Sequence, residues 1–207
     1  ALLIGERSNF IKILIMYFLF LIFFYEIKNF KKFLIMIFFI LISTSIILSS
    51  LSFKNRFFHE IINKNKDLVE KILINNENKD LKITISQNRH LSHYYVAVQI
   101  FKDNILFGSG FKSFRIESQK DKYKKNEIDG SSTHPHQFHF EILSELGIVG
   151  YILIFSNLIY VLFRKFKDKN ELIKIGSFLF IIASIIPILP SGSFFTSFGA
   201  TIFFINY

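Results

Sequence analysis

Hydrophobic positions along this chain gather into long uninterrupted blocks, and polar positions gather between them. Residues 33–53, for example, include no charged side chain. A helix needs about 20 apolar residues to cross the roughly 30 Å hydrocarbon core of a bilayer. The blocks therefore predict membrane-spanning helices at residues 10–25, 33–53, 146–163, 175–189 and 194–205.

The last two blocks are short for a span; Pro187 lies near the end of the first, and Pro190 and Gly192 lie between them. They form either two spans joined by a tight turn or one helix followed by a re-entrant segment. The predicted fold is an all-α polytopic integral membrane protein with four or five transmembrane helices, treated as one domain over residues 1–207. Because the chain starts with Ala1 and not Met, we expect it to be the C-terminal part of a larger bundle.

The charges in the short loops predict the orientation. Residues 26–32 carry three Lys against one Glu, and residues 164–174 carry five Lys or Arg against two acids. Short basic loops remain in the cytoplasm. The long loop 54–140 then lies on the opposite face, which is the periplasm in a bacterium. A loop of this length is usually functional or disordered.

The long loop has internal periodicity. Residues 68–73 show helical spacing, and residues 81–86 alternate like a short strand. Residues 91–102 predict an amphipathic helix whose aromatic side chains suit the membrane interface. A glycine-containing turn, FGSGF, follows that helix, and a polar, charged stretch leads to the histidine-rich sequence HPHQFHF.

Cysteine content and net charge exclude some kinds of site and favour one kind of partner. The chain has no Cys, which excludes disulfides and thiolate metal sites, and its net charge is +9. Because the positive charge lies beside membrane spans and in one loop, lipid phosphate is a better partner than nucleic acid.

Three histidines, His134, His136 and His139, fall directly before a predicted span. They could be zinc ligands, although no matching carboxylate motif accompanies them. They could be interfacial residues at a helix start, which is the more common situation. They could also supply a general base, because imidazole titrates near pH 6.5. Pro135 fits the first turn of a helix, which would direct His136 along that helix toward the bilayer.

Three arginines lie on the same predicted side of the membrane: Arg7, Arg89 and Arg115. Each taken singly suits a solvated flank, whereas together with the histidines they could bind phosphate, which a guanidinium matches with paired donors. Gly108 and Gly110 form a G-x-G pattern, but without a βαβ context it is weak support for a nucleotide loop.

These segments resemble the family of O-antigen ligases and polymerases. The stretch HPHQFHFEILSELGIVGY is similar to the family's His-Asn signature that leads into a membrane helix, and alignment on ELGIVG places the family's His on His136. Gln137 stands where Asn is usual, and Phe140 where Leu is usual. GER, which contains Arg7, and NRHLSHYYVAVQIFKDNILFGSGFKSFR resemble the family's arginine-bearing motifs, although Asn104 and Ile105 stand where Pro is common.

The resemblance implies metal-independent transfer of a glycan from undecaprenyl diphosphate at the periplasmic face of the bacterial inner membrane, without a cofactor. A ligase uses the lipid A core oligosaccharide as acceptor, whereas a polymerase extends the glycan itself. His136 would deprotonate the acceptor, and Arg7 and Arg89, with Arg115 as a further candidate, would bind the diphosphate. Supporting roles fall to His134, Gln137, His139 and Glu145. A non-catalytic membrane protein for glycan transport or scaffolding is the alternative from another class.

Overall fold

The structure is a computed structural model that describes residues 7–24, 29–49, 89–123, 130–167, 172–187 and 189–206. The chain divides into two compact units, residues 1–76 and 77–207, and each is described by itself. The predicted helical spacing at 68–73 and the alternation at 81–86 lie outside the described residues.

The first unit contains two apolar helices, α1 (Arg7–Phe23) and α2 (Asn29–Leu48). They pack against each other through Tyr17 and Phe39, whose ring centres are 4.6 Å apart. The Lys32 ammonium group donates a hydrogen bond to the carbonyl of Ile22 (3.2 Å). This contact satisfies a carbonyl at the end of α1, where the helix itself supplies no donor.

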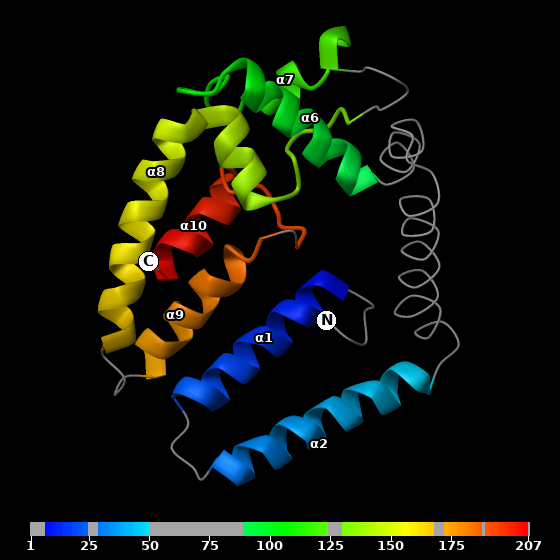
Figure 1. Cartoon of the computed structure of the whole chain (residues 1–207), viewed down its shortest axis with the longest axis vertical. Helices are drawn as coiled ribbons and strands as arrows, with labels where there is room; N and C mark the ends of the chain where they lie inside the picture. The colour runs from blue at the N-terminus through cyan, green and yellow to red at the C-terminus, as the bar shows by residue number, and fades with distance from the viewer. Residues whose placement is uncertain are drawn as a thin grey trace, which may run out of the picture. The chain divides into compact units, whose positions relative to one another are not determined.

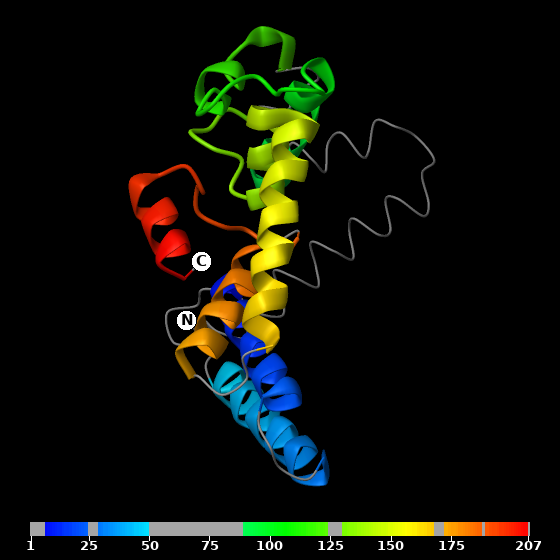
Figure 2. The same ribbon diagram turned by 90° about the vertical axis from the view of Figure 1, so that its left-hand side faces the viewer.

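All regular secondary structure in the described part of the second unit is helical, with turns and loops between the helices and no strand. Its elements are α6 (Arg89–Asp103), α7 (Phe114–Glu117), the 3₁₀ turn η2 (Asp121–Tyr123), α8 (Phe138–Lys167), α9 (Leu172–Ser184) and α10 (Ser197–Asn206). Figures 1 and 2 show α6 and α7 beside the N-terminal end of α8, with α9 along the other end of α8.

Two helices of the described residues are long and apolar enough to cross a membrane, Asn29–Leu48 and Phe138–Arg164. Helices Ser8–Phe23 and Leu172–Ser184 are apolar but shorter. An all-α fold with membrane-spanning helices is therefore supported. The total of four or five spans and the periplasmic position of loop 54–140 stay predictions.

The helix predicted at residues 91–102 is confirmed as α6, and the membrane-interface position of its aromatic face stays a prediction. The expected interfacial face consisted of Leu91, Tyr94, Tyr95, Val98 and Phe101. The buried stripe contains His93, Val96, Ala97 and Ile100, with Tyr94 at its edge. Phe114 and Tyr123 complete this core, so the buried face of α6 packs against the segment that follows it in the chain.

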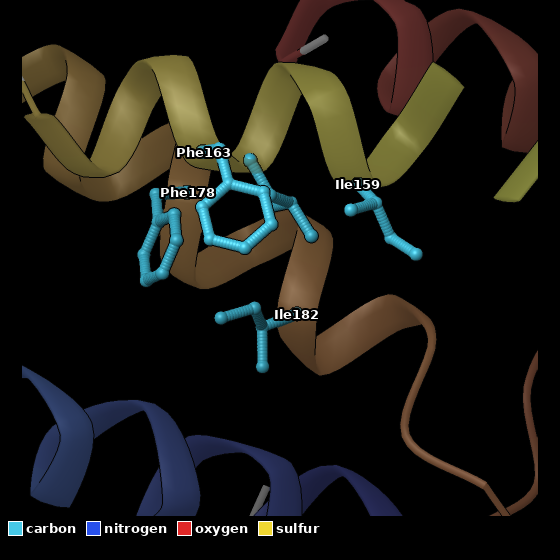
Figure 3. A pocket seen from close by; sticks show the side chains of 5 residues that line it. Ile159, Phe163, Phe178 and Ile182 are labelled. Atoms are coloured by element: carbon cyan, nitrogen blue, oxygen red, sulfur yellow. The ribbon is translucent and has the colours of Figure 1, made fainter. Parts of the chain in front are cut away.

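A second core joins α8, α9 and α10 through Leu158, Ile181 and Phe203. Beside it, an apolar pocket of about 330 Å³ opens between α8 and α9 (Figure 3). Its lining is Ile159, Leu162, Phe163, Phe178 and Ile182. All of the described residues that line this pocket are apolar.

Candidate active site

The site is built around a sharp bend in α8 at Gly147. This residue has φ 66° and ψ −168°, so a short helix, residues 138–146, precedes the long one. The bend is visible near the N-terminal end of α8 in Figure 1. The sequence predicts a continuous helix from Pro135 toward the bilayer, and the bend at Gly147 shows that this continuity is wrong.

The turn after α6 satisfies the backbone groups that the bend leaves unpaired. Two of its amides donate to the end of the short helix, and two of its carbonyls accept from the start of the long helix. The four bonds are Ser109 to Ser144 (3.0 Å), Gly110 to Glu145 (2.9 Å), Ile148 to Ile105 (2.8 Å) and Val149 to Leu106 (3.1 Å). A helix terminus has such unpaired groups, so this turn caps two helix ends at once.

The glycines of FGSGF and ELGIVG serve this close approach. A Cβ added at Gly108 would lie 2.3 Å from the backbone carbon of Glu145, and one at Gly147 would lie 2.4 Å from the Leu106 oxygen. The Glu145 carboxylate accepts bonds from the backbone amides of Lys112 (2.7 Å) and Phe114 (3.2 Å). Glu145 therefore fixes the turn, and Gly108 packs against protein backbone.

Glu141 fixes a second segment in the same way. Its buried carboxylate accepts bonds from the hydroxyl of Ser193 and from the backbone amide of Phe194 (2.8 Å). The neighbouring Ser191 amide donates to the carbonyl of His136 (2.8 Å). The connection between α9 and α10 is thereby attached to the backbone of the candidate base.

His136 lies before α8 and not inside it. Its φ is 58°, a left-handed conformation that costs a non-glycine residue on the order of 1–3 kcal/mol. The helix begins at Phe138, and Gln137 caps it by accepting a bond from the Phe140 amide (3.0 Å). The prediction that Pro135 starts the helix is wrong, because Gln137 takes the N-cap position.

The left-handed turn places the His136 ring among three other imidazoles. Ring centres lie 4.0 Å away at His134, 5.2 Å at His93 and 5.7 Å at His90. The Ser132 hydroxyl is 3.4 Å from His136 Nε2, a long contact. Together, His90, His93, His134 and His136 form a cluster that we call the histidine cluster.

Burial and neighbouring positive charge favour the neutral form of two rings in this cluster, His136 and His134. Burial is the largest cause that lowers the pKa of His136 to about 4, followed by His134, His93, His90 and Arg89. Burial and then His93 also lower the pKa of His134. At neutral pH the His136 ring therefore has a free lone pair, and the charge of Arg89 lies close enough to act on it.

His93 occupies the interior side of this cluster. Its side chain is 1% exposed, and its Nδ1 is 3.0 Å from the carbonyl oxygen of Gly130. A carbonyl accepts, so Nδ1 carries the proton and Nε2 is an acceptor. That Nε2 is buried and has no hydrogen-bond partner in the described part of the chain.

The other predicted site residues lie elsewhere. His139 is 2.9 Å from the Tyr151 hydroxyl through Nδ1 and 2.7 Å from the Ile185 carbonyl through Nε2, so both ring nitrogens are occupied. Arg115 is exposed on α7, and the described residues show no contact between it and the histidine cluster. Arg7 is the first residue of α1, in the other unit, so its proposed role stays a prediction.

Within the described ranges, no group of three or more His, Cys, Asp or Glu side chains is arranged to hold a metal ion.

A family model described as O-antigen ligase matches residues 1–155. This match covers most of the 207 residues. The chain belongs to the O-antigen ligase family. No curated protein and no solved structure gave a match.

For this member of the O-antigen ligase family, the matched region contains α6, the turn after it and the bend in α8. The connection between α9 and α10 lies beyond residue 155, yet it contacts His136 and Glu141 through Ser191, Ser193 and Phe194. Residues outside the family match therefore help to hold the candidate site.

Sequence reasoning missed His90 and His93. Their spacing of three residues directly after Arg89 was the available signal, because it puts both rings near one face of a helix. His93 also lies on the same stripe of the helix as Val96 and Ile100. In the sequence it therefore appears as one polar residue within an apolar face.

Proposed function

We propose that this chain is a membrane glycosyltransferase that moves a glycan from undecaprenyl diphosphate to a sugar hydroxyl of the lipid A core. The family assignment supports glycan transfer in general. The observation that carries the residue-level proposal is the His136 ring, which is neutral and within the influence of Arg89 and lies just before the short helix that leads, through the bend at Gly147, into the long apolar part of α8.

In the proposed reaction, the acceptor oxygen attacks the anomeric carbon of the donor sugar. A glycosidic C–O bond forms, and the bond from that carbon to the diphosphate oxygen breaks with its electron pair. His136 takes the hydroxyl proton, a contribution typically worth 10²–10⁴-fold in rate. Arg89 stabilises the negative charge that develops on the leaving diphosphate.

The position of the site suits such a donor. The polyprenyl chain stays in the bilayer while the sugar stays in water, so the reacting bond lies at the interface. His136 precedes a helix of Phe138–Arg164 that is long and apolar enough to span the membrane. We place this site on the periplasmic face of the bacterial inner membrane, with no metal and no cofactor.

Arg7 and Arg115 are further candidates for the diphosphate. Arg89 is the better supported of the three, because its charge acts on His136. His134 is a candidate for the same site, since its ring centre is 4.0 Å from that of His136. Gln137, Glu145 and His139 support the site by holding the backbone around it.

The second candidate activity is O-antigen polymerisation, in which the acceptor is the non-reducing end of another lipid-linked glycan. Its support is the same chemistry, because base and diphosphate contacts are identical for both acceptors. A non-catalytic transport or scaffold protein is the remaining alternative, and it predicts that His136 tolerates substitution.

The test is His136→Ala in a bacterial host that makes O-antigen but lacks its own ligase. Lipopolysaccharide is separated on a gel, and the lipid-linked donor is measured from the same cells. We expect the wild type to restore the ladder and His136→Ala to accumulate donor. His139→Gln is the control for the loss of an imidazole, because both nitrogens of that ring make hydrogen bonds to Tyr151 and Ile185, so it measures a structural contribution without removing the proposed base.

If the His136→Ala variant still makes the ladder when it is present in the membrane in the same amount as the wild type, His136 is not the general base. If the wild type lengthens lipid-linked glycans without attaching them to lipid A, polymerisation replaces ligation.

A further inference from the structure

His93 has a buried nitrogen for which the described structure gives no partner. An unpaired buried acceptor costs about 1–3 kcal/mol, so such groups in native proteins call for an explanation. Its other nitrogen is fixed by the carbonyl of Gly130. The tautomer of the His93 ring is therefore fixed, and the lone pair of Nε2 can accept a hydrogen bond.

Gly130 packs directly against α6, and this contact requires a glycine. A Cβ at residue 130 would lie 2.4 Å from the Ser92 oxygen and 2.6 Å from a Val96 methyl group. Only glycine brings its carbonyl this close to His93 without displacing the helix. The hydrogen bond between His93 Nδ1 and the residue 130 carbonyl therefore depends on glycine at that position.

The ring of His136 is a candidate donor for His93 Nε2. An N–H···N bond in the plane of two imidazoles separates their centres by about 5 Å, because the nitrogens approach to about 2.9 Å. The two ring centres are 5.2 Å apart and the rings are tilted by 32°. The separation of the two ring centres therefore matches that of such a bond, which requires an N–H of His136 to be directed at His93 Nε2.

We propose that His93 is a positioning residue for His136: its Nε2 accepts the N–H of His136, and its Nδ1–H donates to Gly130. This arrangement sets the tautomer of His136, so that its other nitrogen directs a lone pair outward. The inference rests on the proposed glycosyl transfer and assigns a role in it to a residue on α6.

The proton balance is simple. The acceptor hydroxyl gives its proton to the outward nitrogen of His136, while the inward nitrogen keeps its own proton. The resulting imidazolium donates to His93 Nε2, and no proton passes to His93. The groups that face His136 are Arg89, His90 and His93 from α6, together with Ser132 and His134 from the segment before α8.

Two substitutions separate the two nitrogens of His93. His93→Asn keeps an N–H near the position of Nδ1 for the Gly130 carbonyl but has no acceptor at the position of Nε2. His93→Gln extends an amide oxygen to the position of Nε2. We expect His93→Asn to keep the thermal stability of the wild type and to lose at least about tenfold in turnover, less than the 10²–10⁴-fold of the base itself. His93→Gln should recover part of that loss.

A second readout does not depend on activity. The protein is labelled with ¹⁵N-histidine in detergent micelles, and the His136 signals are identified by their absence in His136→Gln. The wild type should show one predominant tautomer of His136, and His93→Asn should show averaging between the two. A pH profile of turnover should differ between the same two proteins.

Each outcome decides the inference. Identical His136 signals in the wild type and His93→Asn would overturn it, and so would a His93→Asn variant with unchanged turnover. Equal losses of stability and turnover in both variants would reduce His93 to a packing role. If no protein transfers glycan but the His136 signals change as expected, the coupling stands and the proposed function fails.

Discussion

Substitution of Gly147 by Ala tests whether the bend in α8 organises the site. Gly147 has φ 66° and ψ −168°, a region that is essentially restricted to glycine and costs other residues on the order of 1–3 kcal/mol. The added Cβ would lie 2.4 Å from the Leu106 oxygen and 2.5 Å from the Gly108 nitrogen. Both neighbours are backbone atoms, so no side-chain rotation relieves the overlap.

The overlap has to open the contact between the bend and the turn after α6. That movement would break the bonds from the amides of Ile148 and Val149 to the turn, each worth about 1 kcal/mol. With the backbone conformation included, we expect the free energy of unfolding to fall by about 3–5 kcal/mol. For a chain of this size such a loss corresponds to a melting temperature lower by about 10 °C.

The assay is thermal unfolding in detergent micelles, followed by circular dichroism at a helical wavelength. Gly176→Ala in α9 is the matched control, because no atom lies within 4 Å of its added Cβ. Alanine is favoured over glycine inside a helix by roughly 0.5–1 kcal/mol, so this control should melt at or slightly above the wild type. If Gly147→Ala and Gly176→Ala have the same melting temperature, the bend and its capping turn do not require glycine at position 147.

Four further predictions follow from the same contacts. Gln137→Ala should lose about 1 kcal/mol of stability through the missing N-cap, and Gln137→Asn should retain it, as urea titration of both variants can show. His139→Phe should lower the melting temperature while keeping glycan transfer per folded molecule, and a loss of transfer at full stability would contradict its packing role. Arg89→Ala should reduce transfer much more than Arg115→Ala when lipid-linked donor is quantified, and equal effects would refute the ranking. The contribution of His136 to stability should fall as the pH drops from 6.5 toward 4, because the unfolded chain takes up a proton that folded His136 resists. Burial raises the pKa of Glu145 to about 7, which acts in the opposite direction in both proteins, so the difference between melting curves of the wild type and His136→Asn at pH 7 and 5 isolates the His136 contribution.

The sequence predicts the helices well where hydrophobicity or periodicity alone decides them. The uncharged block at 33–53 falls largely on α2, and the periodic stretch 91–102 falls within α6. Local pattern is enough in these cases because a long apolar run has few alternatives to a helix in lipid.

The bend at Gly147 could not be predicted in this way. ELGIVG reads as part of a continuous helix, since one glycine inside a helical pattern is tolerated. What ends the first helix is the set of donors and acceptors from residues 105–110, which lie far away in the sequence. The roles of Glu145 and Gly108 depend on that same tertiary contact.

The histidine cluster was half predicted for a related reason. His134 and His136 stand out because they are close together in the sequence, while His90 and His93 come from α6 and meet them only through the fold. Periodicity also hid His93, because a polar residue in a buried stripe looks like the limit of that stripe. The left-handed conformation of His136 carries no reliable sequence signal for a residue other than glycine.

Under the proposed function, the low pKa of His136 has a consequence for the order of events. A base with a pKa of about 4 is neutral at physiological pH but draws a proton only weakly. A diphosphate bound beside Arg89 would bring negative charge to the same place, and a nearby opposite charge favours the protonated imidazole. Binding of the donor would therefore strengthen the base, so the acceptor hydroxyl is activated chiefly when a leaving group is already present.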